Sequence, residues 1–168
     1  QCEHDKNASA LIASPSLEFL IAVQAAIEAQ LETLPRADIA RAAITNNGFI
    51  VRTESVEKAA EVVSLYAPEH LHIDVRDAWS ILGRIENAGA ILLGPFSSAP
   101  LGDYMAGPSH TLPTAGNARF ASPLNVDDFV KKTSLLSFSA DASRALSMDA
   151  ARFADFEGLE GHARRARL

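Results

Sequence analysis

Residues 48–93 read GFIVRTESVEKAAEVVSLYAPEHLHIDVRDAWSILGRIENAGAILL, and their hydrophobic spacing changes twice from that of a strand to that of a helix. A compact apolar run at 49–51 precedes residues whose apolar positions recur at helical spacing. A strand at 71–75, a helix at 76–86 and a strand at 90–93 follow. Alternation of this kind is typical of a parallel sheet covered by helices. The sequence therefore predicts an α/β fold, Rossmann-like but incomplete.

The same alternation begins upstream, with a short buried strand at 8–13. Ser14 and Pro15 are typical of a helix start, because a capping residue precedes proline at the first helical position. Pro35 ends that helix and starts another, which stops at Asn46-Asn47-Gly48. The apolar residues on one face of the first helix are Leu20, Val23, Ile27, Leu31 and Leu34.

Residues 94–123 break the pattern. This stretch of 30 residues has no hydrophobic periodicity, yet it holds nine of the 17 glycines and prolines. Connections this long are usually functional or disordered, and the apolar residues scattered here argue against disorder. We interpret the stretch as an ordered functional loop that leaves the carboxyl end of a strand, where parallel sheets bind ligands. It carries a carboxylate and an imidazole seven residues apart, Asp103 and His110.

The composition changes after Pro123. We expect a short helix near 126–130, a strand or extended segment at 133–138, and a helical region at 141–165 that is interrupted near Gly158. The chain is therefore divided into an α/β sheet domain at 1–123, with the long loop 94–123, and a mostly helical C-terminal tail at 124–168.

Composition excludes several classes of partner. The 168 residues carry a net charge of -6 and have a pI of about 5.3, which gives no general attraction to nucleic acid or anionic lipid. No apolar run approaches the ~20 residues of a membrane span. The basic run at 164–167 suits a solvated helix end. Cys2 is the single cysteine, which rules out an internal disulfide and suits a cytoplasmic protein. We expect neither a nucleic-acid nor a membrane partner.

Glu69 and His70 lie where a helix gives way to a strand, directly after Pro68. An adjacent carboxylate and imidazole can divide proton transfers, one activating water and the other accepting and returning protons. Taken alone, such a pair at a helix end is more often exposed to solvent without a catalytic role. His72 would share the strand face of His70, and we assign it a packing role.

Polar residues near both ends of the chain are further candidates for function. Gln1 and His4 are three residues apart, so in a helix they could hold one metal, although a polar N-terminal turn is the more common explanation of such a pair. Near the other end, Glu157 and His162 lie beside glycines, where a frayed helix terminus is the alternative.

The set of motifs as a whole favours function. In order, the chain contains Gln1 with His4, Glu69-His70, Gly102-Asp103-Tyr104, Gly107-Pro108-Ser109-His110 and Glu157 to His162. With them it closely resembles, over all 168 residues, the C-terminal portion of the histidinol dehydrogenase family, zinc- and NAD-dependent enzymes that complete histidine biosynthesis. Further matching segments are Leu34-Pro35-Arg36, Asn87-Ala88-Gly89-Ala90-Ile91, Leu112-Pro113-Thr114 and Ala118-Arg119-Phe120-Ala121-Ser122-Pro123.

The resemblance implies a role for each candidate. Glu69 and His70 match the family's acid-base pair, and Glu157 matches a carboxylate that binds the substrate ammonium group. In the family, zinc positions histidinol while two NAD take up hydride, first from the alcohol and then from the hydrated aldehyde. The residues that match zinc ligands are Gln1, His4, Asp103 and His162. The residues expected to contact substrate are Gln1, His4, His70, Asp103, His110, Glu157 and His162.

The chain departs from the family pattern at two positions, and the resemblance also implies how the protein assembles. Ser109 stands where the family commonly has asparagine, and Cys2 where alanine is usual. Family members are longer, so the NAD-binding residues are expected in a region before Gln1, and the chain alone is expected to be inactive. In the family, the C-terminal tail crosses to the partner subunit, which predicts a homodimer with exchanged tails in which His162 completes the partner's zinc site.

Two other classes of function remain open at this point. One is a zinc hydrolase in which Glu69 activates metal-bound water, and the other is a metal-binding or dimerisation module without chemistry. The order of the motifs favours the dehydrogenase.

Overall fold

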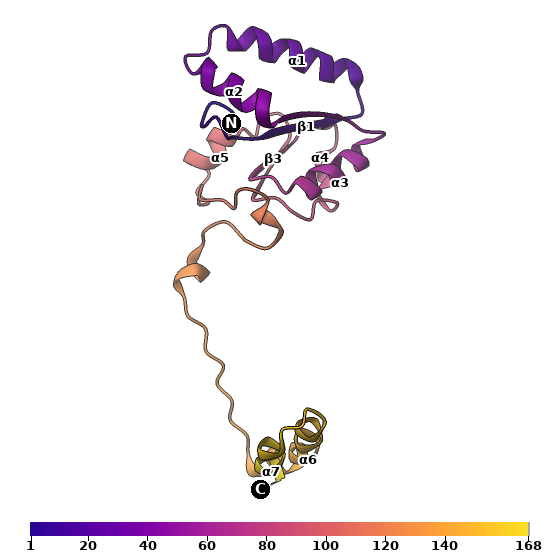
Figure 1. Ribbon diagram of the computed structural model, residues 1–168, viewed down its shortest axis with the longest axis vertical. Helices are drawn as coiled ribbons and strands as arrows, with labels where there is room; N and C mark the ends of the chain where they lie inside the picture. Colours follow the sequence, from indigo (N-terminus) through magenta and orange to yellow (C-terminus); the bar gives the residue numbers. More distant parts are fainter. Residues whose placement is uncertain (168) are drawn as a thin grey trace. The chain divides into compact units, whose positions relative to one another are not determined.

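The computed structural model of the chain describes residues 1–167, which form two compact units. The first comprises Gln1–Phe129 and the second begins at Val130. Figure 1 shows the first unit in indigo to orange and the helices of the second in yellow. Each unit is described by itself.

The first unit alternates strands with helices, as the sequence predicts. Its elements, in order, are β1 (Ala10–Ser14), α1 (Leu17–Leu31), α2 (Ala37–Asn47), β2 (Gly48–Arg52), α3 (Val56–Tyr66), β3 (His70–Ile73), α4 (Ala78–Leu82), β4 (Ala90–Leu93), α5 (Ala99–Met105) and two short 3-10 turns, η1 (Asn117–Arg119) and η2 (Val126–Phe129).

The strands pair in parallel, which confirms the α/β class. In the described chain they form two separate pairs: β1 pairs with β2, Ala10 opposite Gly48, and β3 pairs with β4, His70 opposite Ala90. Parallel strands need a crossover between them, and the helices supply it. The carboxyl ends of β3 and β4 lie side by side, at Ile73 and Leu93. The segment that carries Asp103 leaves from this edge.

Helix starts follow capping chemistry, with one correction to the sequence analysis. Ser16, and not Ser14, caps α1, because its side chain accepts the backbone N–H of Phe19. Ser55 caps α3 by accepting the N–H of Lys58. A hydrogen bond with the Ser55 side chain also lowers the pKa of Glu57.

The core around β3 is built from its inward-facing residues. Leu71 and Ile73 are buried, while His70 and His72 occupy the opposite face, as the alternation of a strand requires. Ala60 of α3 and Ile81 of α4 pack against this pair. The helices between the strands therefore cover one face of β3, and its other face remains available for polar chemistry.

A buried serine connects α3 to the segment that enters β4. Ser64 is 6% exposed, and its hydroxyl accepts the N–H of Glu86 at 3.0 Å. Its carbonyl accepts the side-chain amide of Asn87 at 3.1 Å. Because buried polar groups need such partners, these bonds fix where β4 begins relative to α3.

The segment 94–123 is ordered, but it is not a loop throughout, because α5 lies within it. Pro100 is at the start of this helix, where a missing N–H costs no hydrogen bond. Gly102 faces Leu92 of β4, and a Cβ there would lie 3.4 Å from the leucine side chain. Proline and glycine are typical of turns, but here Pro100 lies in the first turn of α5, and Gly102, in the middle of the helix, lets it lie close to β4.

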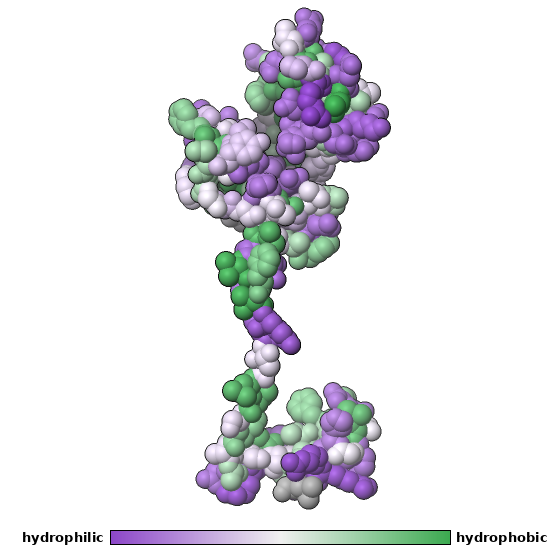
Figure 2. All heavy atoms as spheres, turned by 90° about the vertical axis from the view of Figure 1, so that its left-hand side faces the viewer, coloured by the Kyte–Doolittle hydropathy of each residue, from purple (hydrophilic) through white to green (hydrophobic). Residues whose placement is uncertain are grey.

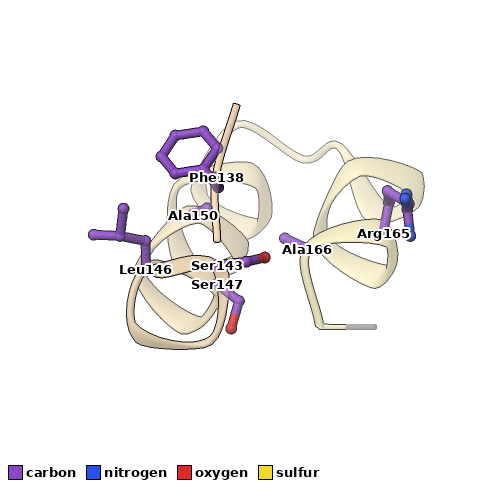
Figure 3. A pocket seen from close by; sticks show the side chains of 7 residues that line it. All are labelled: Phe138, Ser143, Leu146, Ser147, Ala150, Arg165 and Ala166. Atoms are coloured by element: carbon purple, nitrogen blue, oxygen red, sulfur yellow. The ribbon is translucent and has the colours of Figure 1, made fainter. Parts of the chain in front are cut away.

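The second unit is a helical pair, α6 (Ala140–Phe156) and α7 (Glu160–Arg167). Gly158, with φ +73°, provides the left-handed turn between them, as the sequence predicts. Three small residues form the buried contact: Ala151, Ala154 and Ala163. Figure 3 shows a hollow on this pair, lined by Phe138, by α6 residues such as Leu146 and by Ala166 of α7.

Residues 130–139 form neither helix nor strand. Of the two structures expected for 133–138, a strand or an extended segment, the segment without a paired strand is the one observed. Large apolar side chains are exposed along it, including Leu135 at 94% and Leu136 at 73%. Figure 2 shows hydrophobic side chains along this part of the chain. Within residues 1–167, none of the helices has the length and apolar character needed to cross a bilayer.

Candidate active site

The site begins at the turn between α3 and β3. Ala67 ends α3 in the left-handed conformation, with φ +53°, and its N–H donates to the carbonyl of Val63. A left-handed residue stops the helix and turns the chain, and Pro68 then prevents it from resuming. Glu69 is therefore in the turn, and His70 is the first residue of β3.

The start of β4 holds this turn through two backbone bonds. The N–H of Gly89 donates to the carbonyl of Pro68 at 2.9 Å, and that of Ala90 donates to the carbonyl of Glu69 at 2.8 Å. A Cβ on Gly89 would lie 2.6 Å from the Glu69 carbonyl oxygen and 3.2 Å from the Pro113 ring. Glycine is therefore required here for close approach of the two backbones.

His70 and Asp103 form a direct side-chain hydrogen bond between β3 and α5. Nε2 of His70 lies 2.9 Å from Oδ1 of Asp103, on α5. The two side chains are only 13% and 25% exposed. An ionised carboxylate only accepts hydrogen bonds, so Nε2 is the nitrogen that carries the proton. The structure thus brings together two of the predicted site residues that are 33 positions apart.

Glu69 faces the other ring nitrogen. Its Oε1 lies 3.8 Å from Nδ1 of His70, which is too long for a hydrogen bond. Nδ1 is buried and has no hydrogen-bond partner in the described structure. With the proton on Nε2, Nδ1 carries the lone pair. A nitrogen that can accept a proton, and that makes no hydrogen bond in the described structure, therefore lies beside the Glu69 carboxylate.

His72 does not have the packing role that the sequence analysis gave it. Its side chain is exposed, and Nε2 donates to the carbonyl of Gly94 at 2.7 Å. The hydrophobic residues of β3 point to the opposite face, so a histidine two positions after His70 has no core to enter. No local sequence signal predicts this bond, because it joins residues 22 positions apart.

The later part of the segment 94–123 is anchored by Arg119. Its guanidinium donates to the carbonyl of Leu65, in the last turn of α3, and to that of Gly116 at 2.9 Å. His110 is exposed and makes no hydrogen bond or ion pair with residues 1–167. The structure therefore orders this segment without bringing His110 into contact with His70.

Gln1 and His4 form a hydrogen-bonded turn and not a helix. The N–H of His4 donates to the carbonyl of Gln1 at 3.2 Å, and Arg36 donates to the carbonyl of His4 at 3.1 Å. Both side chains are exposed. The turn places the imidazole and the amide on one short segment, with Arg36 fixing its backbone.

Glu157 and His162 belong to the second unit. Glu157 is the C-terminal cap of α6, and His162 is exposed on the first turn of α7. Within residues 1–167, no three or more His, Cys, Asp or Glu side chains gather closely enough to hold a metal ion. The four candidate zinc ligands remain predictions.

Over residues 1–168 the sequence matches the family described as histidinol dehydrogenase. The chain belongs to this family. Histidinol dehydrogenase of Geobacillus kaustophilus (strain HTA426) is 51% identical over 164 residues, which are 98% of this chain and 39% of the relative. That of Moorella thermoacetica is 48% identical over 168 residues, which are 100% of this chain and 40% of the relative.

A solved structure is similar as well. The crystal structure of histidinol dehydrogenase from Elizabethkingia anophelis matches with a TM-score of 0.88 and 31% sequence identity. The match covers 99% of this chain and 38% of that one. The chain thus spans about two fifths of the length of the histidinol dehydrogenases that it matches.

Gly89 provides a test of how the turn is held. We expect Gly89→Ala to reduce the free energy of unfolding by about 2 kcal/mol, because the new methyl group must displace the Glu69 carbonyl. The backbone amide signals of Glu69 and His70 should shift in ¹H–¹⁵N spectra. Urea unfolding of the chain measures the first effect.

Gly83→Ala is the matched control, since a Cβ there has no atom within 4 Å. Its stability should stay within ~0.5 kcal/mol of the wild type. Equal stability of the two variants would show that close approach at Gly89 does not hold the turn.

Proposed function

We propose that the chain is the C-terminal part of a zinc- and NAD-dependent histidinol dehydrogenase, which oxidises L-histidinol through histidinaldehyde to L-histidine in histidine biosynthesis. The observation that carries the proposal is the cluster of Glu69, His70 and Asp103 around the start of β3. A cytoplasmic location belongs to the same proposal, supported by the absence of an internal disulfide.

The donor atoms of the candidate ligands fit zinc. His4 offers an imidazole nitrogen, Asp103 a carboxylate and Gln1 an amide oxygen, which are nitrogen and oxygen ligands that Zn²⁺ accepts. Oδ1 of Asp103 contacts His70, and its second oxygen has no hydrogen-bond partner in the described structure. Zinc bound there would provide an attachment point for the amine or imidazole of histidinol. His162 is proposed as the fourth ligand.

His70 is proposed to accept the proton of the alcohol. Its Nε2 is engaged by Asp103 and its Nδ1 is shielded, so one nitrogen must be released before it can act. If the Asp103 carboxylate turned toward a metal and the ring proton moved from Nε2 to Nδ1, where the Glu69 carboxylate could accept it in a hydrogen bond, Nε2 would carry the lone pair that takes the substrate proton. The protonated ring would then lie close to the carboxylates of both Glu69 and Asp103, which stabilise its charge.

Glu69 is proposed to activate the water that hydrates the aldehyde. Its side chain is 30% exposed, against 13% for His70, so solvent reaches the carboxylate more readily than the imidazole. A carboxylate that makes no hydrogen bond to His70 is free to hold a water molecule. The two adjacent residues thus divide the proton transfers of the two oxidation steps.

The exchanged tail is also part of the proposal. Large apolar side chains of the second unit are more exposed than is usual on the surface of a monomeric protein, with Phe156 at 92% and Leu135 at 94%. A homodimer in which 124–168 packs on the partner subunit would cover them. Glu157 and His162 would then reach the partner's site, the first binding the ammonium group of histidinol and the second the zinc.

The role of His70 is tested in the complete enzyme that contains this chain. His70→Asn should reduce turnover by roughly 10²-fold or more, because asparagine cannot take the proton, while the zinc content stays unchanged. Steady-state NADH formation with histidinol and a metal analysis of the same sample measure both. Near-normal turnover would contradict the role. Glu69→Gln is the matched comparison, since its defect should fall on the aldehyde step in single-turnover kinetics.

The exchanged tail is tested by mixing two inactive variants of the complete enzyme, Asp103→Ala and His162→Ala, after dissociation and reassociation. About half of the dimers should be mixed, and in each one site receives both defects while the other receives neither. Activity should therefore recover to roughly a quarter of the wild-type value. Mixed dimers that form without any activity would show that His162 serves its own subunit.

A further inference from the structure

β3 presents two histidines on one face, and both bind the segment that follows β4. His70 and His72 are two residues apart in a strand, so their side chains leave the same face. Nε2 of His70 contacts Asp103 at 2.9 Å, and Nε2 of His72 contacts the carbonyl of Gly94 at 2.7 Å. Two side chains of β3 are thus hydrogen-bonded to the segment that follows β4, one at its start and the other in α5.

Gly94 is the residue at which that segment turns away from β4. Its φ of +76° is in the left-handed region, and its N–H donates to the carbonyl of Ile73 at 2.9 Å. Its carbonyl accepts both from His72 and from the N–H of Ser97, the latter at 3.3 Å. β3 therefore binds both backbone polar groups of Gly94, the N–H through the Ile73 carbonyl and the carbonyl through the His72 side chain.

From Gly94 the chain reaches Asp103 by a short and ordered path. The hydroxyl of Ser97 donates to the carbonyl of Leu93 at 2.7 Å, and α5 begins directly after Ser98. Gly102 then faces Leu92 of β4. Because each step is fixed, the direction of the chain at Gly94 determines where Asp103 lies relative to His70.

We propose that His72 is a positioning residue of the active site. By holding the Gly94 carbonyl it sets the turn out of β4, and through α5 it places the Asp103 carboxylate on Nε2 of His70. The inference rests on the proposed function of the His70–Asp103 pair. His72 itself touches neither Asp103 nor His70 through any hydrogen bond, so its effect is exerted through the backbone.

The test follows the side-chain nitrogens of His70 in this chain by long-range ¹H–¹⁵N spectra, which report the hydrogen bond from Nε2 independently of catalysis. His72→Ala removes the donor, and the Nε2 signal of His70 should shift toward that of a solvent-exposed ring. His72→Gln retains an N–H donor and should restore most of the wild-type shift. The control is Thr33→Val, which removes a side-chain bond to the carbonyl of Gln30 at 3.3 Å, outside the site.

A second variant keeps the proposal testable if His72→Ala does not fold. Gly94→Ala strains the same turn, where a Cβ has no neighbour within 4 Å, and it leaves both histidines in place. It should shift the His70 signal in the same direction. In the complete enzyme, His72→Ala should lower kcat by about 10-fold through misplacement of the reacting groups, and His72→Gln should recover it.

The outcomes separate this inference from the proposed function. An unchanged His70 signal in His72→Ala, or in Gly94→Ala if the first variant does not fold, overturns the positioning role whatever the activity. A shifted signal that Gln restores supports it. If the signal shifts while His70→Asn retains full turnover, the proposed function fails and the positioning of Asp103 by His72 stands.

Discussion

The hydrogen bond between His70 and Asp103 is the constraint on which the rest of the site depends. It joins the first residue of β3 to a seven-residue helix, α5, in which Gly102 faces Leu92 of β4. It also determines which ring nitrogen of His70 carries the proton, and so which one remains basic. A bond with a charged acceptor in a partly shielded position is among the stronger polar contacts in proteins.

Backbone geometry provides the setting for this bond. Ala67 and Gly94 adopt left-handed conformations at the two places where the chain enters β3 and leaves β4. Gly89 lets the backbone of β4 lie against the Glu69 carbonyl. The face of β3 that carries His70 is thus fixed mainly by the turns around one parallel pair of strands, while the buried core of that pair lies on the opposite face.

The sequence predicts the fold class because strand and helix periodicities alternate clearly from β1 to β4. It does not predict α5, since Pro100 and Gly102 are typical of turns, and only the approach of Gly102 to Leu92 of β4 shows why a helix fits there. The adjacency of Glu69 and His70 is visible in the sequence, although such a pair alone is more often solvated than functional. The contact of His70 with Asp103, 33 residues away, is not visible there, because it depends on the direction of the chain at Gly94. The bond of His72 is long-range for the same reason.

A double-mutant cycle between His70 and Asp103 tests the central claim most directly. The free energy of unfolding of His70→Ala, Asp103→Ala and the double variant would be measured by urea titration of this chain, using the fluorescence of Trp79 in the first unit. A coupling energy of about 1–2 kcal/mol is predicted for a charge-assisted bond in a partly shielded site. Effects that add within ~0.3 kcal/mol would show that the pair does not hold the site together.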